Sequence, residues 1–170
     1  MAAPLGHTVL ASTDGAAFAS LRHQATPRAE RYAIGRELRR TVPRSALATW
    51  NDDDREADPV QQVIAGNEGR VDRLIPVRIG RMVANPFAFL RGAAAVMATD
   101  LAGQPIAGIP VQAGGDSHLM NFGAFVTPEN NILFDVNDFD ETLPGVDFTV
   151  DLKRLAASVA VAALQTDVSK

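Results

Sequence analysis

Two short acidic segments contain the side chains of this sequence best suited to chemistry. The first is Gly115-Asp116-Ser117-His118-Leu119-Met120-Asn121, and the second is Phe134-Asp135-Val136-Asn137-Asp138-Phe139-Asp140-Glu141. Hard divalent cations such as magnesium prefer oxygen ligands of the kind that Asp and Asn supply. A carboxylate can also accept a proton from an attacking hydroxyl group. The two segments together therefore predict a metal-dependent active site.

In the first segment, Asp116 is the candidate catalytic base and His118 a second candidate catalytic residue. Two structural roles remain open beside these. Asp116 could cap a turn, because Asp after Gly favours turns. The ring of His118 could bond the backbone and steady the loop. Asn121 is a candidate magnesium ligand, with bonding within the loop as its alternative role.

In the second segment, Asp138 is the preferred magnesium ligand, with Asp135 and Asp140 as further candidates. Side chains alternate between the two faces of a strand, so a regular strand would place Asp138 and Asp140 on one face and Asp135 on the other. This alternation favours Asp138 as the ligand and Asp140 as a helper.

Charge is distributed unevenly along the chain. Seven arginines lie between Arg22 and Arg44, a run that we expect to be a solvated surface. Between Gly92 and Leu152 there are nine carboxylates and no Lys or Arg. Some of these acids lie in apolar, strand-like sequence, where an unpaired charge is costly. A bound cation, or arginines from elsewhere in the fold, would offset that cost.

Two arginines are candidates for binding phosphate groups, because guanidinium groups recognise phosphate well. They are Arg81 and Arg91. For Arg91 the alternative is a solvated side chain or a salt bridge to an acid of the 92–152 segment.

Composition narrows the class of protein. The 170 residues are 46% hydrophobic and carry a net charge of -4, which fits one globular domain or part of one and argues against a nucleic-acid binder. The absence of cysteine excludes disulfides and cysteine-ligated metal sites. Apolar stretches are too short to cross a membrane and no secretory signal is evident, so we expect a cytoplasmic protein.

The patterning predicts an α+β fold with N-terminal helices, a small antiparallel β-hairpin region that holds the site, and a C-terminal helix. We expect residues 1–34 to be weakly ordered. Predicted helices cover Tyr32 to Arg40, Pro59 to Ala65, Arg70 to Met82 with a break or kink at Pro76, Pro86 to Leu101, and a stretch from Asp151 onward. Predicted strands cover Ile109 to Gln112, Phe122 to Val126 and Asn131 to Phe139, with turns at Thr127-Pro128-Glu129-Asn130 and Leu143-Pro144-Gly145.

The spacing of Asp116, His118 and Asn121 resembles the Asp-x-His-x-x-Asn catalytic loop of kinase-like small-molecule phosphotransferases, such as aminoglycoside phosphotransferases and choline kinases. In those enzymes the Asp acts as base, the Asn holds a metal, and a hairpin leads to a second metal-binding Asp. Asp138-Phe139-Asp140 resembles that element. The chain departs from the pattern in having Gly114 where those enzymes usually have a His. It also lacks a glycine-rich phosphate loop and a Val-Ala-Ile-Lys-like strand.

A longer resemblance, over roughly residues 35–164, is to the bacterial family called domain of unknown function 2252. Seven blocks match in order, among them Arg78-Ile79-Gly80-Arg81-Met82, Pro86-Phe87-Ala88-Phe89-Leu90-Arg91-Gly92, the two acidic segments, and Asp151-Leu152-Lys153-Arg154-Leu155-Ala156-Ala157-Ser158. The resemblance implies that residues 35–170 are the N-terminal portion of one such domain, truncated at its C-terminus. It implies no known reaction.

The hypothesis that we favour is a phosphotransferase that uses magnesium and ATP on an unknown small-molecule or protein hydroxyl. The alternatives are a metal-dependent hydrolase, in which the same acids activate water, and a non-catalytic binding or regulatory module. Neither nucleic acid nor membrane is expected as a partner, and the sequence does not specify an oligomeric state.

Overall fold

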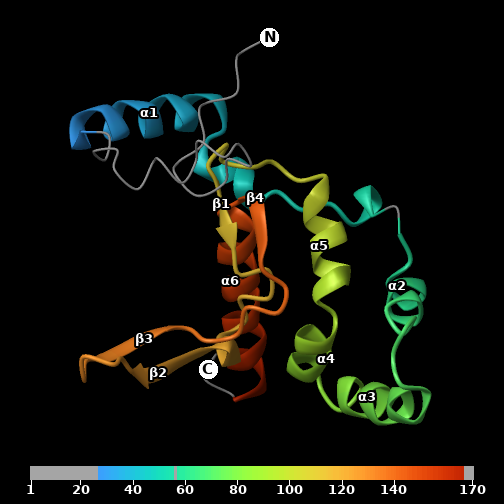
Figure 1. The fold of residues 1–170 in the computed structure, drawn as a ribbon. Helices are drawn as coiled ribbons and strands as arrows, with labels where there is room; N and C mark the ends of the chain where they lie inside the picture. The colour runs from blue at the N-terminus through green and yellow to red at the C-terminus, as the bar shows by residue number, and fades with distance from the viewer. Residues whose placement is uncertain (1–26, 56, 167–170) are drawn as a thin grey trace.

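Helices and two small antiparallel sheets make up the fold, which confirms the predicted α+β class (Figure 1). The structure is a computed structural model that describes residues 27–55 and 57–166. Its helices are α1 (Arg28–Thr41), α2 (Pro59–Ala65), α3 (Ile75–Met82), α4 (Pro86–Gly92), α5 (Ala94–Ala102) and α6 (Thr149–Gln165). Its strands are β1 (Pro110–Ala113), β2 (Phe122–Val126), β3 (Ile132–Val136) and β4 (Leu143–Asp147). Short 3₁₀ turns cover Arg44–Ala48, Asp52–Asp54, Asp72–Leu74 and Leu119–Asn121.

Local signals placed several elements correctly. The α2 helix begins at Pro59, as predicted, because the Asp58 side chain accepts a hydrogen bond from the Val60 N–H at 2.8 Å. The β2 strand has its predicted bounds, and the turn after it contains Asn130 with a φ of 64°. The α1 helix is longer than predicted and begins at Arg28, inside the segment 1–34 that we expected to be weakly ordered; residues 1–26 lie outside the described part of the chain.

The single helix predicted from Pro86 to Leu101 is wrong, because the structure has two helices, α4 and α5, with a break between them. Two guanidinium groups from other helices satisfy carbonyl groups at this break. Arg154 donates to the Leu90 carbonyl at 2.6 Å, and Arg78 donates to the Gly92 carbonyl at 2.8 Å. These tertiary hydrogen bonds stabilise a helix end that the sequence periodicity did not reveal.

The predicted turn at Leu143-Pro144-Gly145 is also wrong, because these residues open β4, which pairs antiparallel with β1. Pro144 lies opposite Gln112, at the point where the register of the pair shifts. A proline without an N–H is tolerated there because each strand of a two-stranded sheet is an edge strand.

The hydrophobic core lies among the helices. Met82, Ala93 and Val96 form a buried cluster, with Val63 and Ile79 packed against it. From the apolar pattern we expect Phe87, Phe89, Met97 and Leu101 to be core residues; in the structure Leu101 is buried, Phe87 and Met97 are half-buried, and Phe89 is exposed. Among the described residues, no helix has the length and apolar character that a membrane span requires.

The elements around the acidic segments have a simple arrangement. The α6 helix runs beside the β1–β4 pair, and the β2–β3 hairpin projects to one side of it (Figure 1). The α4 and α5 helices contact α6 from the other side. The loop between β1 and β2 therefore lies where the hairpin, α4 and α6 meet.

Candidate functional site

The loop 114–121 is closed by hydrogen bonds among its own motif residues. The Asp116 backbone carbonyl accepts from the His118 N–H at 2.7 Å and from the Asn121 side-chain amide at 2.8 Å. The His118 carbonyl accepts from the Asn121 N–H at 2.9 Å. The Asp-x-His-x-x-Asn spacing thus defines one compact turn. The loop-bonding role predicted as the alternative for Asn121 is present, and its side-chain Oδ1 accepts no hydrogen bond within the described chain.

One face of α6 holds this loop in place. Asp151 accepts from the N–H groups of Gly114 at 2.8 Å and Gly115 at 3.0 Å. Seven residues further along the helix, the Ser158 hydroxyl accepts from the Leu119 N–H at 2.9 Å and is fully buried. Positions three, four and seven apart lie on the same side of a helix, so α6 presents a continuous polar face to the loop.

Asp116 is paired with a buried arginine of the same helix face. Arg154 is 3% exposed. Its Nε donates to Asp116 Oδ1 at 2.8 Å, and its Nη2 lies 2.6 Å from the same oxygen. We expected either a bound cation or an arginine from elsewhere in the fold to offset the charge of the acids in this part of the sequence. For Asp116, Arg154 is such an arginine. The second oxygen, Oδ2, faces His118 Nε2 at 3.7 Å, beyond hydrogen-bond distance.

His118 is buried, at 2% exposure, and its ring packs edge-on against Phe87 at 6.4 Å. Its Nδ1 accepts from the Met120 N–H at 3.1 Å, so in the neutral ring the proton lies on Nε2, on the side of Asp116. Burial lowers the pKa of His118; the Asp116 carboxylate opposes this shift, while the positive charges of Arg91 and Arg154 add to it. His118 is therefore a neutral side chain whose N–H faces the Asp116 carboxylate.

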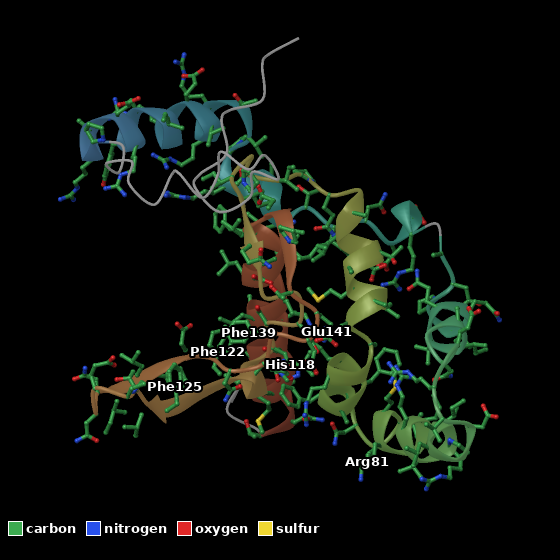
Figure 2. The ribbon with its side chains drawn as sticks, viewed as in Figure 1. Arg81, His118, Phe122, Phe125, Phe139 and Glu141 are labelled. Atoms are coloured by element: carbon green, nitrogen blue, oxygen red, sulfur yellow. The ribbon has the colours of Figure 1, made fainter. Side chains whose placement is uncertain are left out.

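The second acidic segment returns to the loop after the hairpin. The Asn137 N–H donates to the Asn121 carbonyl at 2.9 Å. Gly115 has a φ of +86°, and a Cβ added to it would lie 2.1 Å from the Glu141 carbonyl oxygen. Only glycine accommodates both the backbone conformation and the close approach. These contacts bring Glu141 against the first residues of the loop, and Figure 2 shows Glu141 near His118 at the base of the hairpin.

The acids of the second segment are not arranged as strand alternation predicted. The β3 strand ends at Val136, so Asp138 and Asp140 lie in the loop after it and the same-face argument does not apply. Asp138 Oδ1 instead accepts from the Asp140 N–H at 3.3 Å, as in an Asx turn. Asp135 remains within β3, exposed, with its Oδ1 bonded to the Val136 N–H at 2.8 Å.

Three neighbouring carboxylates nevertheless act on Glu141. Burial raises the pKa of Glu141, and the negative charges of Asp116, Asp138 and Asp140 raise it further. Glu141 received no role in the sequence analysis, although it lies at the end of the second segment. Within the described residues no cation forms a salt bridge with Asp138, Asp140 or Glu141. The charge of this acidic cluster is therefore only partly offset, through Asp116.

The two predicted phosphate ligands differ in position. Arg91 is exposed on α4, and its charge acts on His118, so it lies beside the loop. Arg81 is exposed at the end of α3 and lies apart from His118 and Glu141 in Figure 2. The structure thus associates Arg91 with the acidic cluster and leaves Arg81 outside it.

In the described part of the chain, the acidic side chains of the cluster do not form a metal cage by themselves. In residues 27–55 and 57–166, no three Asp, Glu, His or Cys side chains converge closely enough to hold a metal by themselves. A cavity of about 570 Å³ lies elsewhere, lined by residues that include Trp50, Arg55 and Gln104. Arg55 spans it, stacked on Trp50 and paired with Asp100. The chemistry of the acidic cluster therefore rests on its charges and exposed oxygens.

Comparison with known proteins identifies one family. Residues 70–170 match the family described as "Uncharacterized protein conserved in bacteria (DUF2252)", a match that includes both acidic segments and α6. No curated protein and no solved structure matches the chain. Since the match covers more than half of the 170 residues, the chain belongs to the DUF2252 family.

Proposed function

We propose that the acidic cluster is the active site of a magnesium-dependent, ATP-using phosphotransferase that acts on a hydroxyl group of an unknown substrate. The observation that carries this proposal is that backbone contacts of Asn137 with Asn121 and of Glu141 with Gly115 bring the second acidic segment against the loop that contains Asp116. The neighbouring acids accordingly raise the pKa of Glu141. Carboxylates held together in this way repel one another, and a divalent cation with phosphate ligands is the partner that relieves such repulsion.

Asp116 is the proposed base. Arg154 holds Oδ1, which fixes the orientation of the carboxylate and leaves Oδ2 without a hydrogen bond among the described residues. A substrate hydroxyl within hydrogen-bond distance of Oδ2 could give its proton to that oxygen. His118 is a positioning residue in this proposal, because its neutral Nε2–H faces Oδ2 and its Nδ1 is bound to the loop backbone.

The residues present fit magnesium in their chemistry. Asn121 Oδ1 and the carboxylate of Asp138 would hold the ion, with Asp140 as helper; Asp135, on β3, lies outside this set. Magnesium bound in this way neutralises charge on transferred phosphoryl groups. Magnesium usually keeps several waters and takes one or two protein carboxylates with substrate phosphates, so the absence of a three-residue cage among the described residues is compatible with the proposal.

Arg91 is the proposed phosphate ligand. Its guanidinium is exposed and its charge acts on His118, so it is available to a negatively charged substrate next to the loop. Arg81 would need a substrate that extends to the end of α3, and it is the weaker candidate.

One observation favours a non-catalytic binding module as the second candidate. The carboxylate of Asp116 is paired with a buried arginine that also bonds the Leu90 carbonyl of α4. Asp116 therefore joins the loop to α6 and α4, a structural role that needs no substrate.

Thermal unfolding in the presence of ligands separates these candidates. A ligand that binds only the folded state stabilises it, by about 2.7 kcal/mol at a hundredfold excess over its dissociation constant. We expect ATP with magnesium to raise the unfolding temperature of the chain, and Asp138→Asn to lose that effect. Asp135→Asn is the matched control, because it removes a charge on β3 outside the cluster. Stabilisation by magnesium alone would favour a hydrolase, and no stabilisation by either ligand would favour the binding module.

A further inference from the structure

The α1 helix separates its charges onto two sides. At roughly 100° per residue, Arg28, Tyr32, Gly35 and Arg39 fall on one face of the helix, with Arg31 at its margin. The acids lie on the opposite face, where Glu37 pairs with Arg40 at 3.2 Å. None of the residues of α1 is buried. The helix therefore presents a face that contains Arg28, Arg31 and Arg39 and no acidic residue, which we call the α1 basic face.

This face lines a cavity. A concavity of about 450 Å³ lies between α1 and the following 3₁₀ turn, lined by Arg28, Arg31, Tyr32, Gly35, Arg39 and Arg44. A Cβ added to Gly35 would lie 3.3 Å from Arg39 Nη1, so the Arg39 guanidinium lies back across the helix at the position that lacks a side chain. The Arg28 guanidinium lies 6.0 Å from the centre of the Tyr32 ring. Four guanidinium groups and one aromatic ring thus surround a shared space.

The four arginines of this cavity have no acidic partner among the described residues. Among the described residues, the arginines that form salt bridges are Arg40, Arg55 and Arg154, and none of them lines the cavity. The 27 residues before α1 contain Asp14 as their sole carboxylate, so the preceding sequence contributes little opposite charge. Cations gathered without counter-charge form a site that favours an anion with several charges.

We propose that the α1 basic face binds a small organic polyphosphate. Guanidinium groups donate paired hydrogen bonds to phosphate oxygens, and the exposed Tyr32 ring can stack on a planar group of the same ligand. The cavity size and the net charge of -4 favour a small ligand over a long nucleic acid. None of the lining residues belongs to the acidic segments, and α1 lies away from the β2–β3 hairpin in Figure 1, so this site is additional to the proposed active site. The α1 arginines are unburied, as expected of a solvated surface, and the proposal adds a ligand to that surface.

Calorimetric titration of the full chain with sodium tripolyphosphate, in EDTA to exclude metal, tests the proposal. We expect saturable binding that weakens by at least about tenfold in the double variant Arg31→Gln/Arg39→Gln, since charge-assisted hydrogen bonds of this kind are strong enough for a tenfold effect. Arg40→Gln is the matched control, because Arg40 lies off the basic face and is already paired with Glu37. Since α1 contains no buried residue, circular dichroism should show both variants folded.

Two further titrations test which part of the ligand is recognised and whether this site is separate from the proposed active site. ATP should bind more weakly to Tyr32→Ala, whereas tripolyphosphate, which has no planar group, should bind that variant normally. Asp138→Asn should leave tripolyphosphate binding unchanged, so failure here is distinguishable from failure of the phosphotransferase proposal. Absence of saturable binding, equal binding by the double variant and Arg40→Gln, or tighter binding of a single-stranded RNA or of anionic vesicles than of tripolyphosphate would each overturn the proposal.

Discussion

A single guanidinium group connects three parts of the fold. Arg154 of α6 bonds Asp116 in the loop and the Leu90 carbonyl in α4, and its Nη1 lies 3.6 Å from Met97 Sδ in α5. A buried ion pair is not by itself a large source of stability, because both charges lose their hydration. Removing one partner is different, since the other charge then stays buried without compensation. At the scale of the residue, Asp116 and Arg154 therefore depend on each other.

We expect Arg154→Met to lower the free energy of unfolding by roughly 3 to 5 kcal/mol, the range found when one partner of a buried pair is removed. Urea denaturation measures this change. The double variant Asp116→Asn/Arg154→Met should lose less than the sum of the two single variants, because it removes both charges together. If the loss of stability in the double variant equals the sum of the two single losses, Asp116 and Arg154 do not stabilise the fold as a pair.

At the scale of the element, local sequence signals determine some helix boundaries, and contacts between distant residues determine others. Asp58 followed by Pro59 was sufficient to place α2, because a capping side chain and a proline act within one helical turn. The break between α4 and α5 could not be predicted in this way, since it is stabilised by Arg78 and Arg154 from distant positions. Pro144 in β4 similarly depends on its partner strand.

In the candidate site too, contacts within one turn of chain were predictable from the sequence, and contacts between distant residues were not. The spacing of Asp116 and Asn121 identified the loop, because both residues lie within one turn of chain. The pairing of Asp116 with Arg154 joins residues 38 positions apart, and nothing in the sequence periodicity indicates which of the arginines would reach the loop. Glu141 was missed for the same reason, because its position depends on the return of the chain to Gly115.

Substitutions at Gly115 and Gly145 test whether the close approach of the Glu141 backbone to the loop contributes to stability. Both have positive φ angles, +86° and +79°, but a Cβ would meet the Glu141 backbone at Gly115 and nothing within 4 Å at Gly145. We expect Gly145→Ala to cost roughly 1 to 2 kcal/mol from backbone conformation alone. Gly115→Ala should cost clearly more, because the rigid Glu141 backbone must move. Chemical denaturation of the two variants measures the difference, and equal losses would show that the approach of Glu141 to the loop contributes nothing.

At the scale of the whole molecule, opposite charges accumulate in separate places. The cavity at the α1 basic face gathers four arginines that have no acidic partner among the described residues, and the acidic cluster gathers carboxylates from both sides of the hairpin. Each collection is unfavourable alone, and the two do not neutralise each other, because no salt bridge among the described residues joins them. We infer that both are built for ligands of opposite charge, a cation at one site and a polyanion at the other.

Glu141 provides the pH test of this interpretation. Burial and neighbouring acids raise its pKa in the folded state, so the unfolded chain releases this proton more readily. The favourable contribution of the protonated group is therefore full below its ordinary pKa of 4.5 and is lost as the pH rises through the raised value. Above that range the ionised Glu141 opposes folding. Glu141→Gln should then be more stable than the natural chain at pH 7.5 in EDTA, and this advantage should vanish near pH 4. The gain should be less than about 1 kcal/mol, because Glu141 is only partly desolvated and most of the residue remains exposed to solvent.

Magnesium should reverse that advantage. If the cluster binds the ion, millimolar magnesium stabilises the natural chain at pH 7.5 and stabilises Glu141→Gln less, because one of the four charges that attract the cation is gone. Glu68→Gln serves as the control, since Glu68 is exposed and lies outside both acidic segments. Urea denaturation at the two pH values, with and without magnesium, measures all of these differences. An equal response of the two Gln variants to magnesium would contradict a cation site at Glu141, and an unchanged stability of Glu141→Gln in EDTA would show that the carboxylates of the cluster do not repel one another.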